Sequence, residues 1–119
     1  ACVLVRVAAR ETLFAFAEQG LFQAFWSPRI EMEWRAASAK PDRGVEAAAI
    51  DGDIALARLR FPAAVVADDA ALAAVEAELS LPDWHDRHVL AAAIVAGADL
   101  IVTDNLRDFP RRRLAAHGV

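Results

Sequence analysis

The chain contains a single cysteine, Cys2, among its 119 residues. One thiol excludes an internal disulfide and a zinc site built from cysteines. No apolar run approaches the ~18 residues that a membrane-spanning helix needs. The first residues also lack the charged, apolar and small-residue order of a secretory signal. We therefore expect a cytoplasmic protein that has no membrane partner.

Basic charge is scarce as well, since 13 Lys and Arg face 17 Asp and Glu and give a net charge of −4. A surface that coats nucleic acid would usually be strongly basic, so that class is disfavoured. A nuclease is still allowed, because carboxylates that recruit Mg²⁺ or Mn²⁺ reverse the local charge where a phosphate must dock. Kinase, nucleotide-hydrolase and esterase functions have no support, because no Gly-rich phosphate loop, Walker pattern or Ser nucleophile elbow occurs.

The length and the order of predicted elements indicate one α/β domain over residues 1–119, with no repeat, linker or second domain. Because strands are expected at or just beyond both ends, we also expect residues to be missing there. Short strands that alternate with helices are typical of a doubly wound parallel sheet. Strands are predicted at Ala1–Val5, Ala63–Ala67 and Leu100–Val102. Helices are predicted at Val7–Gln19, from Ser27 to before Lys40, at Val45–Leu59 and at Leu81–Ala96. Two segments stay open: Leu21–Trp26 is a short helix or strand, and Asp68–Leu79 is a weak helix or a loop.

The most informative segment runs from Leu81 to Pro110. It contains an acidic helix start, an Ala-rich helix that Gly97 ends, a short aliphatic strand and a second acidic turn. In a parallel α/β sheet, helix starts and the carboxyl ends of strands are where ligands collect. Carboxylates at both places therefore predict a divalent-metal site.

Four residues from separate elements are the candidate metal ligands and catalytic residues: Glu33, Asp86, Asn105 and Asp108. Their hard oxygen atoms suit Mg²⁺ or Mn²⁺, and such an ion could orient a phosphodiester and lower the pKa of an attacking water. Each also has an ordinary structural alternative. Glu33 could pair with Arg29 one turn earlier, Asp86 could complement the helix dipole, and the other two could be turn residues.

Neighbouring polar residues have less specific interpretations. Asp83 is expected to cap the helix that follows Pro82. His85 and His88 are three residues apart and could bind a metal through their imidazoles. Alternatively, His88 packs beside the acidic cleft, while His85 and Trp84 face solvent or a partner.

Several segments, in order along the chain, resemble the PIN-domain nucleases. They are ACVL, RETLFAFAEQGLF, WSPRIEMEW, LPDWHDRHVLAAAIVAGAD and LIVTDNLRDFP. The resemblance covers nearly the whole chain and is weakest over residues 41–79. It implies a three-layer α/β/α sandwich with a central parallel sheet, and an Mg²⁺- or Mn²⁺-dependent phosphodiesterase that cuts single-stranded RNA. Many small members of the family are toxins that a partner protein holds inactive.

The resemblance also implies roles for individual residues. Glu33 matches the acid of the family's second helix, and Asp86 matches its third acid. Asn105 falls where the fourth acid usually lies, with Asp108 close by. The family's first acid would end a strand immediately before Ala1. An asparagine in place of an aspartate removes one negative charge, which should weaken metal binding unless a neighbouring carboxylate compensates.

Two functions from different classes are thus consistent with the sequence. The leading hypothesis is a PIN-like, metal-dependent endoribonuclease, which could be the toxin of a toxin–antitoxin pair. The alternative is a non-catalytic PIN-like module for binding or assembly. Asn105 favours the module, whereas the presence of Glu33 and Asp86 favours the enzyme.

The predicted partners are an RNA substrate, an antitoxin protein and a second copy of the chain. The homodimer is suggested by the many apolar residues, three tryptophans included, some of which a monomer would expose. Contact with RNA is expected to involve the metal together with basic side chains, because the chain itself is acidic. The tryptophans are Trp26, Trp34 and Trp84, and the basic residues are Arg6, Arg10 and the run Arg111 to Arg113.

Overall fold

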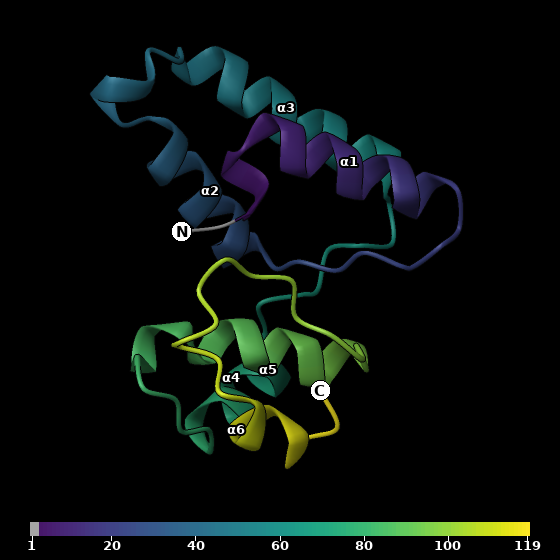
Figure 1. Ribbon diagram of the computed structural model, residues 1–119, viewed down its shortest axis with the longest axis vertical. Coiled ribbons are helices and arrows are strands. Elements are labelled where there is room, and N and C mark those ends of the chain that lie inside the picture. The colour runs from purple at the N-terminus through teal and green to yellow at the C-terminus, as the bar shows by residue number, and fades with distance from the viewer. Residues whose placement is uncertain (1–2) are drawn as a thin grey trace.

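The computed structural model describes residues 3–119, and its regular secondary structure is helical. Figure 1 shows two groups of helices, with α1, α2 and α3 in one group and α4, α5 and α6 in the other. Extended chain before α2 and after α3 lies between the groups. The six α-helices are α1 (Val7–Glu18), α2 (Pro28–Ser38), α3 (Ala47–Arg60), α4 (Ala70–Ala77), α5 (Arg87–Ala96) and α6 (Arg111–Ala115), and three short 3-10 helices are η1 (Val3–Val5), η2 (Pro41–Arg43) and η3 (Trp84–Asp86).

The predicted central parallel sheet is not present in residues 3–119, so the prediction of an α/β/α sandwich is wrong. Helices make up 59% of the structure and β-structure only 2%. That β-structure is one parallel bridge between Trp26 and Val65. In the bridge, Trp26 donates its N–H to the carbonyl of Ala64 (3.0 Å), and Val66 donates its N–H to the carbonyl of Trp26 (2.8 Å).

The first predicted strand is replaced by a turn of helix. Within Ala1–Val5, the described part Val3–Val5 forms η1, and Arg6 donates its N–H to the carbonyl of Val3 (3.3 Å). Ala1 and Cys2 lie outside the described residues. A turn of 3-10 helix does not present its N–H and C=O groups in the alternating directions that pairing with neighbouring strands requires.

The other two predicted strands are almost unpaired. Of Ala63–Ala67, only Val65 forms a bridge. Leu100–Val102 makes no backbone–backbone hydrogen bond to any residue between 3 and 119, and Leu100 is 78% exposed. Aliphatic and β-branched residues favour extended backbone, but a strand also needs neighbours for its N–H and C=O groups. Composition alone therefore does not establish that these segments pair in a sheet.

Three of the four predicted helices are confirmed to within two residues at each end, whereas the helix predicted at Leu81–Ala96 begins only at Arg87, after η3. Local signals mark two of these ends. The side-chain oxygen of Ser27 accepts the backbone N–H of Ile30 (3.3 Å), and Pro28 occupies the first position of α2. Gly97 ends α5 with a φ of 69°, a conformation that residues with a Cβ adopt at a cost. The segment Asp68–Leu79, which the sequence left open, contains α4.

Each group of helices has its own apolar core. In the N-terminal group, the rings of Phe14 and Phe61 lie 5.0 Å apart, and Phe14 also packs on Trp26 at 5.8 Å. In the C-terminal group, the buried side chains of Leu72 and Leu90 join α4 to α5. Both residues of the bridge, Trp26 and Val65, pack in the N-terminal core, whereas Val66 belongs to the C-terminal core, so the chain passes from one core to the other directly after the bridge.

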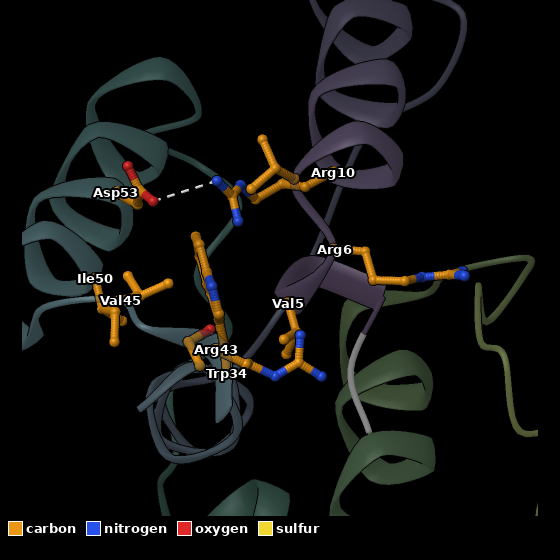
Figure 2. A pocket seen from close by; sticks show the side chains of 10 residues that line it. Val5, Arg6, Arg10, Trp34, Arg43, Val45, Ile50 and Asp53 are labelled. Carbon is orange, nitrogen blue, oxygen red and sulfur yellow. Dashed lines mark hydrogen bonds and ion pairs between the residues drawn. The ribbon is translucent and has the colours of Figure 1, made fainter. Parts of the chain in front are cut away.

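A buried arginine supports the N-terminal group. Arg10 is 5% exposed and donates to the carbonyl of Leu4 (2.7 Å) and to the carboxylate of Asp53 (3.2 Å). Its guanidinium also lies 5.0 Å from the ring centre of Trp34. Figure 2 shows the cavity of about 310 Å³ beside these groups, where Arg43 approaches from η2. Because the cation of Arg10 is already engaged, it is poorly placed to contact an RNA phosphate.

Candidate metal centre

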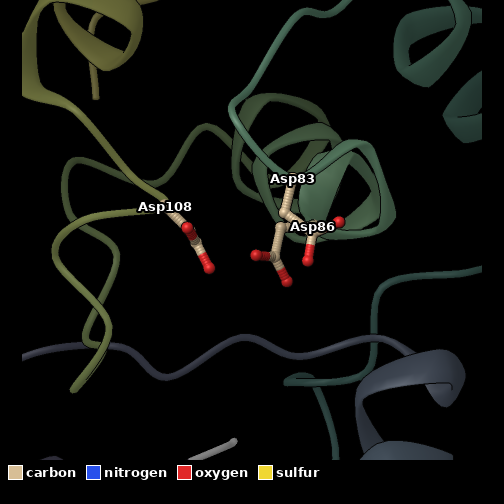
Figure 3. Close-up of side chains that lie close together, drawn as sticks. All are labelled: Asp83, Asp86 and Asp108. Carbon is tan, nitrogen blue, oxygen red and sulfur yellow. The ribbon is translucent and has the colours of Figure 1, made fainter.

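Three aspartates meet at the edge of the C-terminal helical group. Asp83, Asp86 and Asp108 each offer one carboxylate oxygen, and these oxygens all lie within 4.8 Å of one another. Figure 3 shows Asp83 and Asp86 at the start of the α5 region and Asp108 facing them from the turn that precedes α6. All three side chains are partly buried. The structure thus brings together two of the predicted ligands, Asp86 and Asp108, with one that the sequence analysis did not include.

Asp83 has the predicted capping role and also belongs to this acidic cluster. It is the N-cap of η3, and its carboxylate accepts the backbone N–H of His85 (3.0 Å). The backbone hydrogen bond and then the imidazole of His85, 3.1 Å away, hold the pKa of Asp83 below its usual value. The spacing of three residues between Asp83 and Asp86 was the available signal. At the start of a helical segment, that spacing places two carboxylates on one side.

Asp86 has the opposite electrostatic environment. Burial raises its pKa above the ordinary value, and the negative charges of Asp83, Asp108 and Glu33 raise it further. The backbone N–H of Asp86 donates to the carbonyl of Asp83 (3.1 Å), but its carboxylate makes no hydrogen bond or ion pair with any residue from 3 to 119. A bound cation would therefore stabilise the charged form of this carboxylate, which the surrounding negative charges disfavour.

Asn105 organises the cluster without adding charge to it. Its side-chain amide donates to the carboxylate of Asp108, and its backbone N–H donates to the hydroxyl of Thr103 (3.0 Å). The neighbouring Asp104 does not join the cluster, because its carboxylate pairs with Arg6 at 2.7 Å. Asp108, not Asp104, is therefore the carboxylate that lies close enough to compensate for the missing charge at position 105.

Glu33 approaches from the other group of helices. Its Oε1 lies 2.7 Å from Nε2 of His88, which is buried in the first turn of α5. The predicted pair with Arg29 is not formed, because Arg29 contacts Glu76 and lies 3.2 Å from Asp68. Glu33 is not among the three clustered aspartates, although its charge reaches Asp86.

The second glutamate of the same segment has a structural role. Glu31 is buried, accepts the indole N–H of Trp26 (2.8 Å) and pairs with Arg58. Glu31 and Glu33 differ in this way because they are two residues apart and project from different sides of α2. Only Glu33 faces the cleft.

His85 and His88 each contact an acidic side chain. His85 lies beside Asp83, and its ring stacks on exposed Trp84 with 4.5 Å between ring centres. His88 lies beside the acidic residues, as predicted, and its Nε2 is engaged by Glu33. The alternative in which the two imidazoles bind one metal together finds no support in this arrangement.

A cavity of about 860 Å³ opens next to the acidic residues. Glu33, Asp86 and Asn105 contribute to its polar side, and apolar residues from both helical groups form most of its wall. Asp86 links the cavity to the cluster, since it belongs to both. A molecule in this cavity would lie beside the carboxylates.

The donor set fits a hard divalent cation. Three carboxylates lie close together, and partial burial raises the pKa of Asp86. No basic side chain among the described residues pairs with Asp86. A divalent cation would offset this repulsion, and carboxylate oxygens are the ligands that Mg²⁺ and Mn²⁺ prefer. Asp83, Asp86 and Asp108 are the residues able to hold such an ion together.

Comparison with known families agrees with this chemistry. A family model described as PIN domain matches residues 1–107, and the chain therefore belongs to the PIN-domain family. Proteins with this domain are generally nucleases that use divalent metals. No curated protein and no solved structure matches the chain. None of the helices within residues 3–119 has the length and apolar character needed to cross a membrane.

Proposed function

We propose that the protein is an endoribonuclease that cleaves single-stranded RNA with the help of Mg²⁺ or Mn²⁺. The observation that carries the proposal is the unneutralised Asp86, beside Asp83 and Asp108, at the wall of a large cavity in a PIN-domain chain. Asp86 and Asp108 are the principal ligands, with Glu33 and Asn105 at the same site. A bound ion would stabilise the negative charge that develops around phosphorus and would lower the pKa of the attacking water.

The residues of the chain would prepare the site in distinct ways. Asp86 and Asp108 provide negative charge for the cation, and the amide of Asn105 fixes the orientation of Asp108. Glu33 stands on the opposite helical group, where it contributes to the same field. Arg111 and Arg112 are exposed without an ion pair to any described residue, and we propose that they contact RNA phosphates.

The test is cleavage of a fluorescently labelled single-stranded RNA, together with calorimetric titration of Mn²⁺. We expect Mn²⁺-dependent cleavage that EDTA stops and that Asp86→Asn abolishes, with loss of Mn²⁺ binding in that variant. Asp42→Asn is the matched control, because Asp42 is exposed in η2 and lies outside the cluster. Unchanged cleavage by Asp86→Asn would overturn the proposal.

A second candidate function is a non-catalytic binding module. The observation that favours it is the uncharged Asn105 in contact with Asp108, which lowers the negative charge available to a metal. In that case the wild-type protein would show neither Mn²⁺ binding nor cleavage, and Asp86→Asn would behave like the wild type in both measurements.

We also propose that a partner protein covers the apolar part of the cavity and that the chain acts as the toxin of a toxin–antitoxin pair. Exposed apolar side chains at the cavity, among them Leu21 and Val102, support a protein partner. Expression in a bacterial host should slow growth, and Asp86→Asn should restore it. Equal growth inhibition by both forms would contradict the toxin role.

A homodimer is a separate proposal, and its sequence-based argument is weaker than expected. Trp26 and Trp34 are buried in the N-terminal core, so only Trp84 remains exposed among the three tryptophans. Exposed Leu59 and Leu100 add apolar surface. Light scattering at micromolar concentration should report twice the chain mass if the dimer forms, whereas a monomer mass would exclude it under those conditions.

A further inference from the structure

His88 occupies an unusual position for an ionisable side chain. It lies in the first turn of α5, two residues after Asp86, and only 4% of it is exposed. Its Nε2 lies 2.7 Å from Oε1 of Glu33, which belongs to α2 in the other helical group. The contact therefore joins the two halves of the molecule at the acidic side of the cavity.

The two ring nitrogens of His88 have different surroundings. Nε2 faces the Glu33 carboxylate, whereas Nδ1 is buried and has no hydrogen-bond partner among residues 3–119. A carboxylate can only accept a hydrogen bond, so Nε2 must carry the proton. A proton on Nδ1 would be a buried donor without an acceptor, which is unfavourable. The geometry thus places a proton on Nε2, which His88 donates to the Glu33 carboxylate.

Glu33 depends on this single contact for its orientation. Its side chain is 49% exposed and makes no other hydrogen bond or ion pair with a described residue. Arg29, one turn earlier on α2, is held by Glu76 and Asp68 and is not available to it. The negative charge of Asp86 repels Glu33 as well. Without His88, the carboxylate would gain rotamer freedom and move toward solvent.

We propose that His88 is a positioning residue, whose Nε2–H holds the Glu33 carboxylate toward the cavity across from Asp86. The proposal rests on the function proposed above, because the value of a fixed Glu33 lies in metal and substrate binding. His88 does not itself act as a metal ligand, since Nε2 is engaged and Nδ1 is enclosed. Residues that orient a ligand side chain through a hydrogen bond often change metal affinity by tenfold or more when lost.

Two substitutions separate positioning from packing. His88→Leu keeps an apolar side chain in the buried site and removes the donor, whereas His88→Gln retains an amide N–H that can reach Glu33. We expect His88→Leu to weaken Mn²⁺ binding about tenfold in a calorimetric titration. His88→Gln should bind Mn²⁺ within about threefold of the wild type. Equal weakening in both variants would overturn the proposal, because a donor would then not be what matters.

A double-mutant cycle tests whether the effect passes through Glu33. In a Glu33→Gln background, His88→Leu should cause little further loss of Mn²⁺ affinity. A loss as large as in the wild-type background would show that His88 acts in another way. Thermal unfolding shows whether each variant folds. If His88→Leu does not fold, Mn²⁺ binding by His88→Gln decides whether the proposal holds.

The contact can also be tested without metal. Long-range nitrogen–proton NMR spectra of the wild type should show a proton on Nε2 of His88. The side chain of Glu33 should become more mobile in His88→Leu but not in His88→Gln. If the wild type fails to bind Mn²⁺ or to cleave RNA, the proposed function fails, while these spectra still judge the positioning. Unchanged Glu33 mobility in His88→Leu would refute it.

Discussion

Asn105 donates its side-chain amide to the carboxylate of Asp108, so an uncharged residue lies in direct contact with the acidic cluster. Replacing it with aspartate should place two carboxylates against each other. We expect Asn105→Asp to lower the free energy of unfolding by about 1 kcal/mol without metal, from repulsion between close charges near the surface. With Mn²⁺ present, the added negative charge should instead tighten metal binding several-fold.

Calorimetric titration and thermal unfolding with and without Mn²⁺ measure both effects. Asn105→Ala is the control, because it removes the amide without adding a charge and should not tighten binding. A variant Asn105→Asp that binds Mn²⁺ no better than the wild type would show that position 105 lies outside the electrostatic reach of the site.

The raised pKa of Asp86 predicts a particular dependence of stability on pH. The folded protein keeps this proton at pH values where the unfolded chain has lost it. The stabilising contribution is therefore complete below the ordinary Asp value of 3.8 and is lost as the pH rises through the higher folded pKa. Mn²⁺ affinity should change in the opposite direction and fall as the pH falls through the same range, because protons compete with the cation.

Urea unfolding at several pH values between about 3 and 7 tests this prediction. Asp86→Asn should be more stable than the wild type at neutral pH, and the difference should shrink on acidification. A constant difference across the range would mean that the carboxyl of Asp86 titrates normally.

Helix ends could be predicted from the sequence because they depend on contacts within a few residues. Ser27 caps α2 and Gly97 ends α5 through local geometry that the residue types make recognisable. The absence of a sheet could not be predicted in the same way. Leu100–Val102 has the composition of a buried strand, yet pairing depends on distant backbone that propensity does not describe.

The candidate site was predictable in composition and less so in arrangement. Asp86 and Asp108 were identified from their places beside a helix start and after an extended segment, and they do meet. Asp83 has the capping role that the sequence predicts. Because that role already explained an aspartate at this position, its membership of the acidic cluster was not predicted. The bond between Glu33 and His88 joins residues 55 positions apart, which no local pattern indicates.

The ion pair between Arg29 and Glu76 should make the protein sensitive to acid. The hydrogen bonds from Arg29 to Glu76 hold the pKa of this glutamate below its ordinary value. Its stabilising contribution is present above the ordinary Glu pKa and is lost as the pH falls through the lower folded value. Because the pair joins α2 to α4, its loss should weaken the connection between the helical groups.

We expect Glu76→Gln to lower the free energy of unfolding by about 1 kcal/mol at neutral pH and to remove part of the loss that acid causes in the wild type. Urea midpoints at neutral and acidic pH give the comparison. Glu78→Gln is the control, because Glu78 is exposed at the end of α4 and has no ion pair with a described residue. Similar effects of both substitutions would argue against a specific role for Glu76.

Arg10 should contribute to stability and not to substrate binding. Its buried guanidinium donates to Leu4 and Asp53 and lies against the ring of Trp34. Arg10→Met keeps an apolar stem but removes these charged hydrogen bonds, so we expect a loss of about 1–3 kcal/mol in the free energy of unfolding. Arg43→Met is the control at the same cavity, because Arg43 is exposed and has no ion pair with a described residue.

Urea unfolding should show a change below about 0.5 kcal/mol for Arg43→Met. For the fraction of Arg10→Met that is folded, the KM for single-stranded RNA should equal that of the wild type, since the guanidinium is enclosed by protein groups. A raised KM with unchanged stability would assign Arg10 to RNA binding instead. That result would require the contact with Asp53 to open, because the guanidinium of Arg10 cannot pair with this half-exposed carboxylate and an RNA phosphate at the same time.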